Sequence, residues 1–275
     1  MLAHSVIAPK SAAPGRYMLF LHGILGTRAN WRGIARRFVG VRPGWGAILV
    51  DLREHGDSLG IGGPHTLSAA AADVTLLEES LDLPIGGALG HSFGGKVVLQ
   101  WLRGRDGQPT EAWIVDASPS VSSAKQDASA TAEVLRVLAA MPRTWASREA
   151  FVAAVAEAGQ PEPIAHWLAK NLRRTDDGHR EFGPDLGVIH DLIQDYARTD
   201  LWDVVEAPPG GCTLDFVIGG RSAAFSELDR ERIAAVAERD SRVRVYLVEE
   251  AGHWVHIDSP DRLIALLTSR PSETP

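Results

Sequence analysis

The chain has 275 residues, of which 45% are hydrophobic and 23% are charged, and its formal net charge is −7. A chain of this size can bury one sizeable core and carry insertions. The mildly acidic balance, with no basic stripe, argues against nucleic-acid binding. The single cysteine, Cys212, excludes an intramolecular disulfide and a cysteine-based metal site, and we expect it to be a buried, inert thiol.

The sequence pattern predicts neither a signal peptide nor a membrane span. Its N-terminus lacks a charged start followed by a long apolar run. Nowhere does an apolar stretch reach the length of about eighteen residues that a spanning helix needs. We therefore expect a cytoplasmic protein. We also expect it to be a monomer or a homodimer.

Short apolar runs alternate with segments of helical periodicity along most of the chain. This alternation is typical of a mostly parallel sheet covered by helices on both faces. The predicted strands are 17–21, 47–50, 85–89, 112–115, 214–218 and 243–248, with an antiparallel edge strand expected near 5–8. Helices are predicted after Trp31, after Thr66 as N-cap, around Lys96, and after Ser259 as N-cap.

The stretch from 120 to 206 interrupts this alternation. It contains helical segments, several prolines and many aromatic residues, but no convincing strand. We interpret it as a helical cap inserted into a core domain made of 1–119 and 207–275. The alternative is an ordinary set of helices covering the sheet.

The strongest motif is Gly90-His91-Ser92-Phe93-Gly94, between an apolar run and a predicted helix. A G-x-S-x-G sequence in this strand–turn–helix context is typical of a nucleophile elbow, in which a tight turn presents the serine. Gly90 and Gly94 provide space for that turn. The alternative is a glycine-rich turn without catalytic function.

Two further loops carry candidate catalytic groups. His22-Gly23-Ile24 follows the first strong strand, so the N–H of Ile24 can form an oxyanion hole with the N–H of Phe93. His253 follows the last strand and can act as the base that takes the proton of Ser92. We do not expect His256 to be catalytic or to form a metal site with His253.

Four segments resemble a branch of the α/β-hydrolases that contains small acyl esterases: LHGILGTRANW, VDLREHGDS, GHSFGGKVV and AGHWVHIDSPDRL. The resemblance implies an α/β-hydrolase fold with a lid, and hydrolysis of small-molecule esters or thioesters without a cofactor or metal. It also implies that Ser92 is the nucleophile, His253 the base, and Ile24 and Phe93 the oxyanion hole. Within this arrangement we expect substrate contacts from His22, Gly23, His91 and Trp254.

The acid of the triad departs from the usual superfamily pattern. Ser222 stands at the usual position, after the penultimate strand, and a serine cannot supply a carboxylate. Asp116, at the end of an earlier strand, is the preferred candidate. Glu227 and Asp229 are alternatives, although Ser226 reads as an N-cap there, which gives both acids a structural explanation. An unforeseen partner is the remaining possibility.

The segment from Asp51 to Ser58 resembles a family motif, and we interpret it as a loop that braces the nucleophile region. The alternative is a substrate contact by His55.

Two rival functions also remain open. One is a C–C hydrolase, perhydrolase or lyase with the same triad, favoured by an arginine-lined pocket for which Arg28, Arg143 and Arg148 are candidates. The other is a ligand receptor or scaffold on the same fold.

Overall fold

A seven-stranded sheet forms the centre of the computed structural model, which describes residues 1–10, 13–105, 107, 109–122 and 130–269. Its strand order is β1-β3-β2-β4-β5-β9-β10, and all neighbours are parallel except β1, which pairs antiparallel with β3. The strands are β1 (His4–Ile7), β2 (Arg16–Leu21), β3 (Trp45–Val50), β4 (Ile85–His91), β5 (Glu111–Val115), β9 (Thr213–Gly219) and β10 (Val243–Val248). The predicted strands, including the antiparallel edge, are thus confirmed to within two residues at each end.

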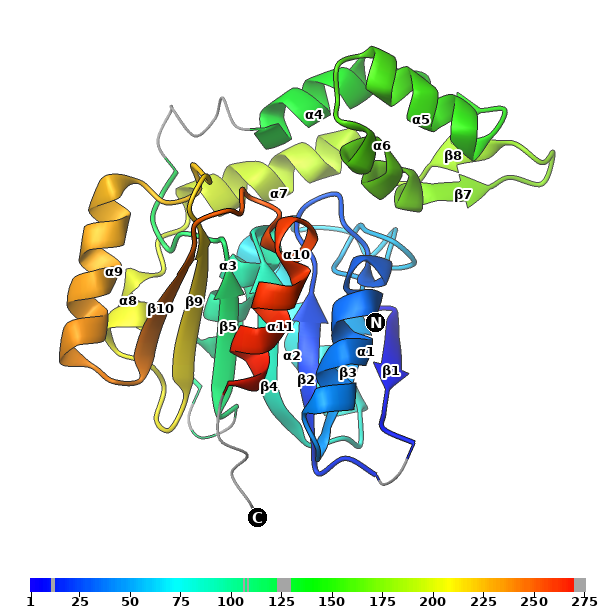
Figure 1. Cartoon of the computed structure of the whole chain (residues 1–275). Helices are drawn as coiled ribbons and strands as arrows, with labels where there is room; N and C mark the ends of the chain where they lie inside the picture. Colours follow the sequence, from blue (N-terminus) through cyan, green and yellow to red (C-terminus); the bar gives the residue numbers. More distant parts are fainter. Residues whose placement is uncertain (11–12, 106, 108, 123–129, 270–275) are drawn as a thin grey trace.

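Two hydrophobic cores cover the two faces of this sheet, and helices lie on both sides of it (Figure 1). Successive side chains of a strand point to opposite faces, and β2 shows this directly. Its Leu19 and Leu21 belong to one core, while its Met18 and Phe20 belong to the other. Such strands are buried on both sides, which explains why they are apolar throughout.

The helices divide between these faces. On one face α1 (Arg32–Val41), preceded by the 3₁₀ turn η1 (Arg28–Trp31), packs against α11 (Pro260–Thr268), which follows the short α10 (Val255–Asp258). On the other face lie α2 (Leu67–Ser80), α3 (Phe93–Leu102), α8 (Trp202–Glu206) and α9 (Glu227–Arg239). No helix of the described ranges is long and apolar enough to cross a membrane.

Local sequence explains where these helices begin. The hydroxyl of Thr66 accepts a hydrogen bond from the N–H of Ala69, as expected of the N-cap of α2. At α11 the predicted helix start is confirmed, but the predicted capping hydrogen bond of Ser259 is wrong. Ser259 precedes the helix, yet its hydroxyl forms no cap and donates instead to Glu250 at 3.1 Å.

The segment between β5 and β9 lies over the carboxyl ends of the parallel strands (Figure 1). Its helices are α4 (Ala130–Ala139), α5 (Arg148–Glu157), α6 (Glu162–Leu168) and α7 (Leu186–Arg198), with the 3₁₀ turn η2 (Ala169–Asn171). The expectation that it contains no strand was wrong. The short strands β6 (Thr144–Trp145), β7 (Leu172–Arg174) and β8 (Arg180–Phe182) form a small antiparallel sheet, in which charged residues hide the apolar pattern of a strand.

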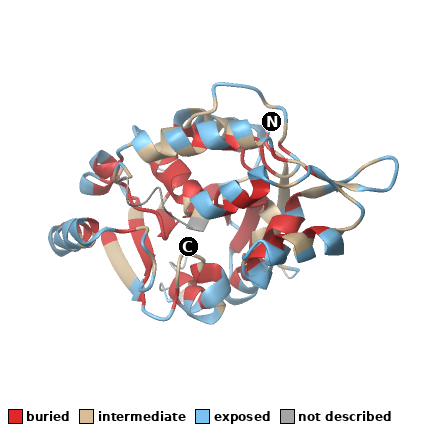
Figure 2. Cartoon of the chain, turned by 90° about the horizontal axis from the view of Figure 1, so that it is seen from above, coloured by how far each residue is buried: buried red, intermediate tan, exposed pale blue. Residues whose placement is uncertain are grey.

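We propose that α4 to α7, with the small sheet, form a cap, and that α8 belongs to the core. The predicted cap, 120–206, includes α8, but this helix packs against α3 and α9. Figure 2 looks down on the cap side and shows exposed residues along the cap helices, interrupted by buried ones. In α7, for example, Ile189 and Leu192 are buried.

Candidate active site

Ser92 lies in a strained turn between β4 and α3. Its backbone angles are φ 51° and ψ −116°, a region that non-glycine residues rarely occupy and that costs of order 1–3 kcal/mol. A Cβ on Gly90 would collide with the backbone of Gly94, and one on Gly94 would lie 2.6 Å from the carbonyl oxygen of His22. Both glycines are therefore required where β4, α3 and β2 meet.

His253 and Asp116 complete a hydrogen-bonded chain with this serine. The Nε2 atom of His253 lies 3.0 Å from Oγ of Ser92, and its Nδ1 atom lies 2.7 Å from Oδ2 of Asp116. Because the carboxylate can only accept, Nδ1 carries the proton and Nε2 is free to accept one from the serine. The three residues follow β4, β10 and β5, whose carboxyl ends share one edge of the sheet.

Asp116 is fully buried and has several donors around its carboxylate. The N–H of Gly219 donates to Oδ1 at 2.9 Å, and the hydroxyl of Ser222 donates to Oδ2. The serine at the usual acid position therefore hydrogen-bonds to the acid from the neighbouring strand. Like Ser92, Asp116 has a positive φ, 49°, which directs its side chain out of the strand.

The alternative acids are occupied elsewhere. Asp229 forms a capping box with Ser226 at the start of α9, and it also accepts from the hydroxyls of Ser118 and Ser120. Glu227 is exposed in the same first turn. The geometry therefore favours Asp116 as the partner of His253.

The two candidate oxyanion donors are unengaged. Within the described part of the chain, neither the N–H of Ile24 nor that of Phe93 has a hydrogen-bond acceptor. The backbone beside Ile24 is held firmly. The N–H of Leu25 donates to Nε2 of His55 at 2.9 Å, and its carbonyl accepts from the amide of Asn171 at 2.7 Å. A fixed donor pair beside a nucleophile is suited to stabilising an oxyanion.

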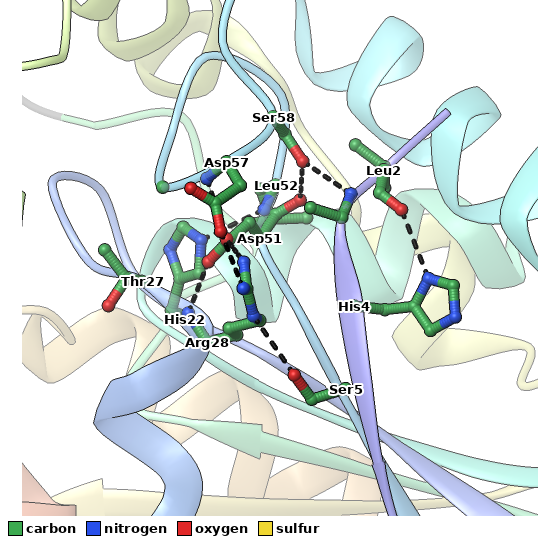
Figure 3. Close-up of polar contacts among 12 residues, drawn as sticks. Leu2, His4, Ser5, His22, Thr27, Arg28, Asp51, Leu52, Asp57 and Ser58 are labelled. Atoms are coloured by element: carbon green, nitrogen blue, oxygen red, sulfur yellow. Dashed lines mark hydrogen bonds and ion pairs between the residues drawn. The ribbon is translucent and has the colours of Figure 1, made fainter. Parts of the chain in front are cut away.

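The segment from Asp51 to Ser58 braces this loop, as Figure 3 shows. Asp51 accepts from the N–H of Arg28 at 2.6 Å and from the N–H of Asp57 at 2.9 Å, and it also pairs with the guanidinium of Arg28. Ser58 links the carbonyl of Asp51 to the N–H of Ala3, both at 2.8 Å. Arg28 is therefore committed to Asp51 and Asp57.

His22 and His55 also act as internal braces. Nε2 of His22 accepts from the N–H of Leu52 at 3.0 Å, and its Nδ1 donates to the carbonyl of Gly23. Nδ1 of His55 donates to the carbonyl of Arg53 at 2.8 Å. Burial lowers the pKa of His22 to about 4 and that of His55 to about 3, so both rings are neutral. The position of His22 does not support the predicted substrate contact, since its ring nitrogens bond the backbone and it does not line the cavity at Ser92.

His91 positions the loop that carries the base. Its Nε2 lies 2.7 Å from the carbonyl oxygen of His253, and its ring packs against those of His253 and His256, with centroids 4.8 and 4.7 Å away. Burial lowers the pKa of His91 well below its usual value, so the ring is neutral and Nε2 donates. Sequence reasoning did not predict this role, because it depends on a contact between residues 162 positions apart.

A narrow cavity lies directly at Ser92. Its volume of about 10 Å³ accommodates about one water molecule, so an ester requires movement of the walls. Three of the four predicted substrate-contact residues, Gly23, His91 and Trp254, line it. The cap contributes Thr131 and Val134 of α4 and Trp167 of α6.

Lys96 connects the elbow helix to both ends of the cap, a role that the sequence did not reveal. Its buried Nζ donates to the carbonyls of Ser120 at 2.7 Å, and of Tyr196 and Thr199 at 2.9 Å each. Burial lowers its pKa to about 8. The three protons of the ammonium group match the three carbonyls, so Lys96 joins α3 to the chain before α4 and after α7.

The chain is similar to several known proteins. The sn-1-specific diacylglycerol lipase ABHD11 of Danio rerio is 26% identical over 263 residues, covering 91% of this chain and 77% of the relative. Esterase YbfF of Escherichia coli strain K12 is 24% identical, covering 90% of this chain and 89% of the relative. A solved structure described as a marine microorganism esterase shares the fold with a TM-score of 0.82 at 20% identity, covering 96% of this chain and 97% of that one.

The sequence profile of the alpha/beta hydrolase family matches residues 18–266. This range begins in β2 and ends in α11, so it includes the elbow, the cap segment and the loop that carries His253. The sheet order, the elbow and this match lead to one conclusion: the chain belongs to the alpha/beta hydrolase family.

Proposed function

We propose that the protein is a serine hydrolase that cleaves carboxylic esters or thioesters of small molecules through an acyl-enzyme on Ser92. The observation that carries this proposal is the chain from Ser92 through His253 to Asp116, with distances of 3.0 and 2.7 Å. The names of the relatives, a lipase and an esterase, support ester bonds as the target. A cytoplasmic location, and a monomer or homodimer, remain part of the proposal.

The geometry supports a two-step acyl transfer. His253 takes the proton of Ser92 as Oγ attacks the carbonyl carbon, and the N–H groups of Ile24 and Phe93 bind the oxyanion. Asp116 stabilises the resulting imidazolium. His253 then protonates the leaving alcohol or thiol, activates a water molecule, and the acid is released.

The rival reactions receive less support from the predicted arginines. Arg28 is paired with Asp51 and Asp57, and Arg143 with Glu181 at 3.7 Å, so neither is available for a dicarboxylate at Ser92. No observation favours a receptor or scaffold over an enzyme. Arg148 lies in a different environment, described below.

Hydrolysis of p-nitrophenyl butyrate by the wild type and by Ser92→Ala tests the proposal. We expect multiple turnovers by the wild type and a loss of roughly 10⁴-fold or more in kcat for Ser92→Ala, because no other nucleophile replaces the hydroxyl. Ser68→Ala, at an exposed position of α2, is the matched control and should retain full activity. Equal turnover by folded Ser92→Ala would overturn the proposal.

A further inference from the structure

A second cavity, of about 390 Å³, lies where the cap meets the core near α10. Four basic side chains reach it: Arg148 at the start of α5, His166 of α6, Lys170 of η2 and His256 of α10. Asn30 and Trp167 also line it. The cavity is far larger than the one at Ser92, and its polar groups are mostly donors.

The carboxylates of Glu149, near Arg148, and Glu162, near His166, are exposed and offset the positive charge of this cavity only weakly. No Asp or Glu lines it, and Arg148 and Lys170 form no ion pair with any described residue. The Arg148 guanidinium donates one hydrogen bond within the described part of the chain, to the carbonyl of His166 at 3.3 Å. The nearby carboxylate of Glu162 is 3.4 Å from His166 and 76% exposed. Two cations thus face the cavity with free donors.

The surroundings of these cations indicate that they repel one another. Burial lowers the pKa of Lys170, and the charges of Arg148 and Arg32 lower it further. A bound anion would relieve this repulsion and accept hydrogen bonds from both side chains.

His256 provides a second, independent indication. Its side chain is only 8% exposed, and its buried Nδ1 atom has no hydrogen-bond partner among the described residues. Burial lowers its pKa to about 3, so the ring is neutral and can donate one N–H. A buried polar atom without a partner is costly, and the residue that carries this one lines the cavity.

Trp167 connects this cavity to the catalytic site, because this residue lines both. We propose that the second cavity binds an anionic group, a carboxylate or a phosphate, that the substrate carries away from the bond attacked by Ser92. This inference rests on the proposed function and narrows it to anionic esters or thioesters. The arginine forms a bidentate contact with the anion, and the lysine provides a point charge.

Two matched pairs of substrates test the inference. In the first pair, p-nitrophenyl hexanoate and p-nitrophenyl hydrogen adipate have acyl chains of equal length and differ by one carboxylate. In the second, hexanoyl pantetheine and hexanoyl phosphopantetheine differ by one phosphate on the leaving thiol. We expect KM to be about tenfold lower for the anionic member of at least one pair. That pair identifies whether the anion is on the acyl or the leaving-group side.

Variants of the cavity make the test specific. Arg148→Gln and Lys170→Gln should each raise KM for the preferred anionic substrate by about fivefold, the size of a partly exposed charge contact, and change KM for its neutral partner less than twofold. Arg143→Gln, which removes the same charge from a cap arginine outside the cavity, should change neither. The anion preference should also weaken with added salt.

The outcomes separate the two proposals. Ser92-dependent hydrolysis with no preference for anionic members, or with no effect of the two cavity variants, overturns the anion site and leaves the esterase standing. If no ester is hydrolysed, calorimetric titration of Ser92→Ala with hexanoyl phosphopantetheine and with hydrogen adipate ester decides the inference. Binding that Lys170→Gln weakens would support it, and no binding of either would overturn it.

Discussion

At the scale of single residues, the environment of Asp116 explains how a serine can stand where the superfamily usually has its acid. The N–H of Gly219 donates to Oδ1 of the carboxylate, and the hydroxyl of Ser222 and Nδ1 of His253 both donate to Oδ2. A buried carboxylate with this many donors is held in one orientation. An acid placed after β5 can therefore form the hydrogen bond to Nδ1 of His253 that the triad needs.

The sequence predicts the catalytic role of a residue well where that role depends on a local motif. Ser92 is recognisable because the two glycines of its turn are adjacent in the chain, and His253 because its loop follows the last strand. The acid remained open between Asp116, Glu227 and Asp229, because the choice depends on which strand lies beside β4.

Other functional contacts depend on distant parts of the chain. Lys96 bonds carbonyls 24, 100 and 103 residues away, and the sequence pattern around it predicts only a helix. His22 was expected to contact substrate for its place in a motif, yet its nitrogens bond backbone groups. The pairing of such atoms is decided by the tertiary fold.

At the scale of elements, the strands of the main sheet are predictable because burial on both faces makes them apolar throughout. The strands of the cap are not. Arg173 and Glu181 sit in β7 and β8, which are only three residues long and partly exposed, so no alternation can be recognised. The sequence also did not separate α8 from the cap helices, because its packing against α3 and α9 depends on the tertiary fold.

Lys96→Met should loosen the attachment of the cap to α3. The variant leaves three carbonyls without their donor, which we expect to cost about 2–4 kcal/mol of unfolding free energy. Urea unfolding measures this loss, and limited proteolysis should cut faster within 130–206. Lys10→Met, at an exposed position before β2, is the matched control and should be nearly neutral. Wild-type stability and wild-type proteolysis of Lys96→Met would contradict the role assigned to this lysine.

At the scale of the whole molecule, four buried histidines make stability depend on pH. Burial lowers the pKa of His22 to about 4 and those of His55 and His256 to about 3, and it lowers that of His91 well below its usual value. They lie in two neighbouring pairs, with ring centroids 5.0 Å apart for His22 and His55 and 4.7 Å for His91 and His256. The fold therefore requires these rings to be neutral.

The sign of the effect follows from proton binding. Below pH 6.5 the unfolded chain takes up protons on these rings, while the folded protein does not until about pH 3–4. The free energy of unfolding should thus decrease as the pH is lowered below 6.5, by up to about 1.4 kcal/mol per pH unit for each histidine.

Urea unfolding at pH 7.5, 6.5 and 5.5 measures this dependence. His256→Gln should reduce the slope by one proton, whereas His190→Gln, at an exposed position of α7, should leave it unchanged. A free energy of unfolding that is constant between pH 6.5 and 5.5 would show that the buried rings do not control stability.

The central claim, that Asp116 completes a triad with His253 and Ser92, is tested most directly by the kcat of Asp116→Asn on p-nitrophenyl butyrate. We predict a loss of roughly 10⁴-fold in a folded protein, because an amide no longer fixes the tautomer of His253 or stabilises its imidazolium. Ser222→Ala removes a neighbouring donor but keeps the carboxylate, and it should lose less than about tenfold. An Asp116→Asn variant as active as Ser222→Ala would mean that the acid lies elsewhere and that this triad is wrong.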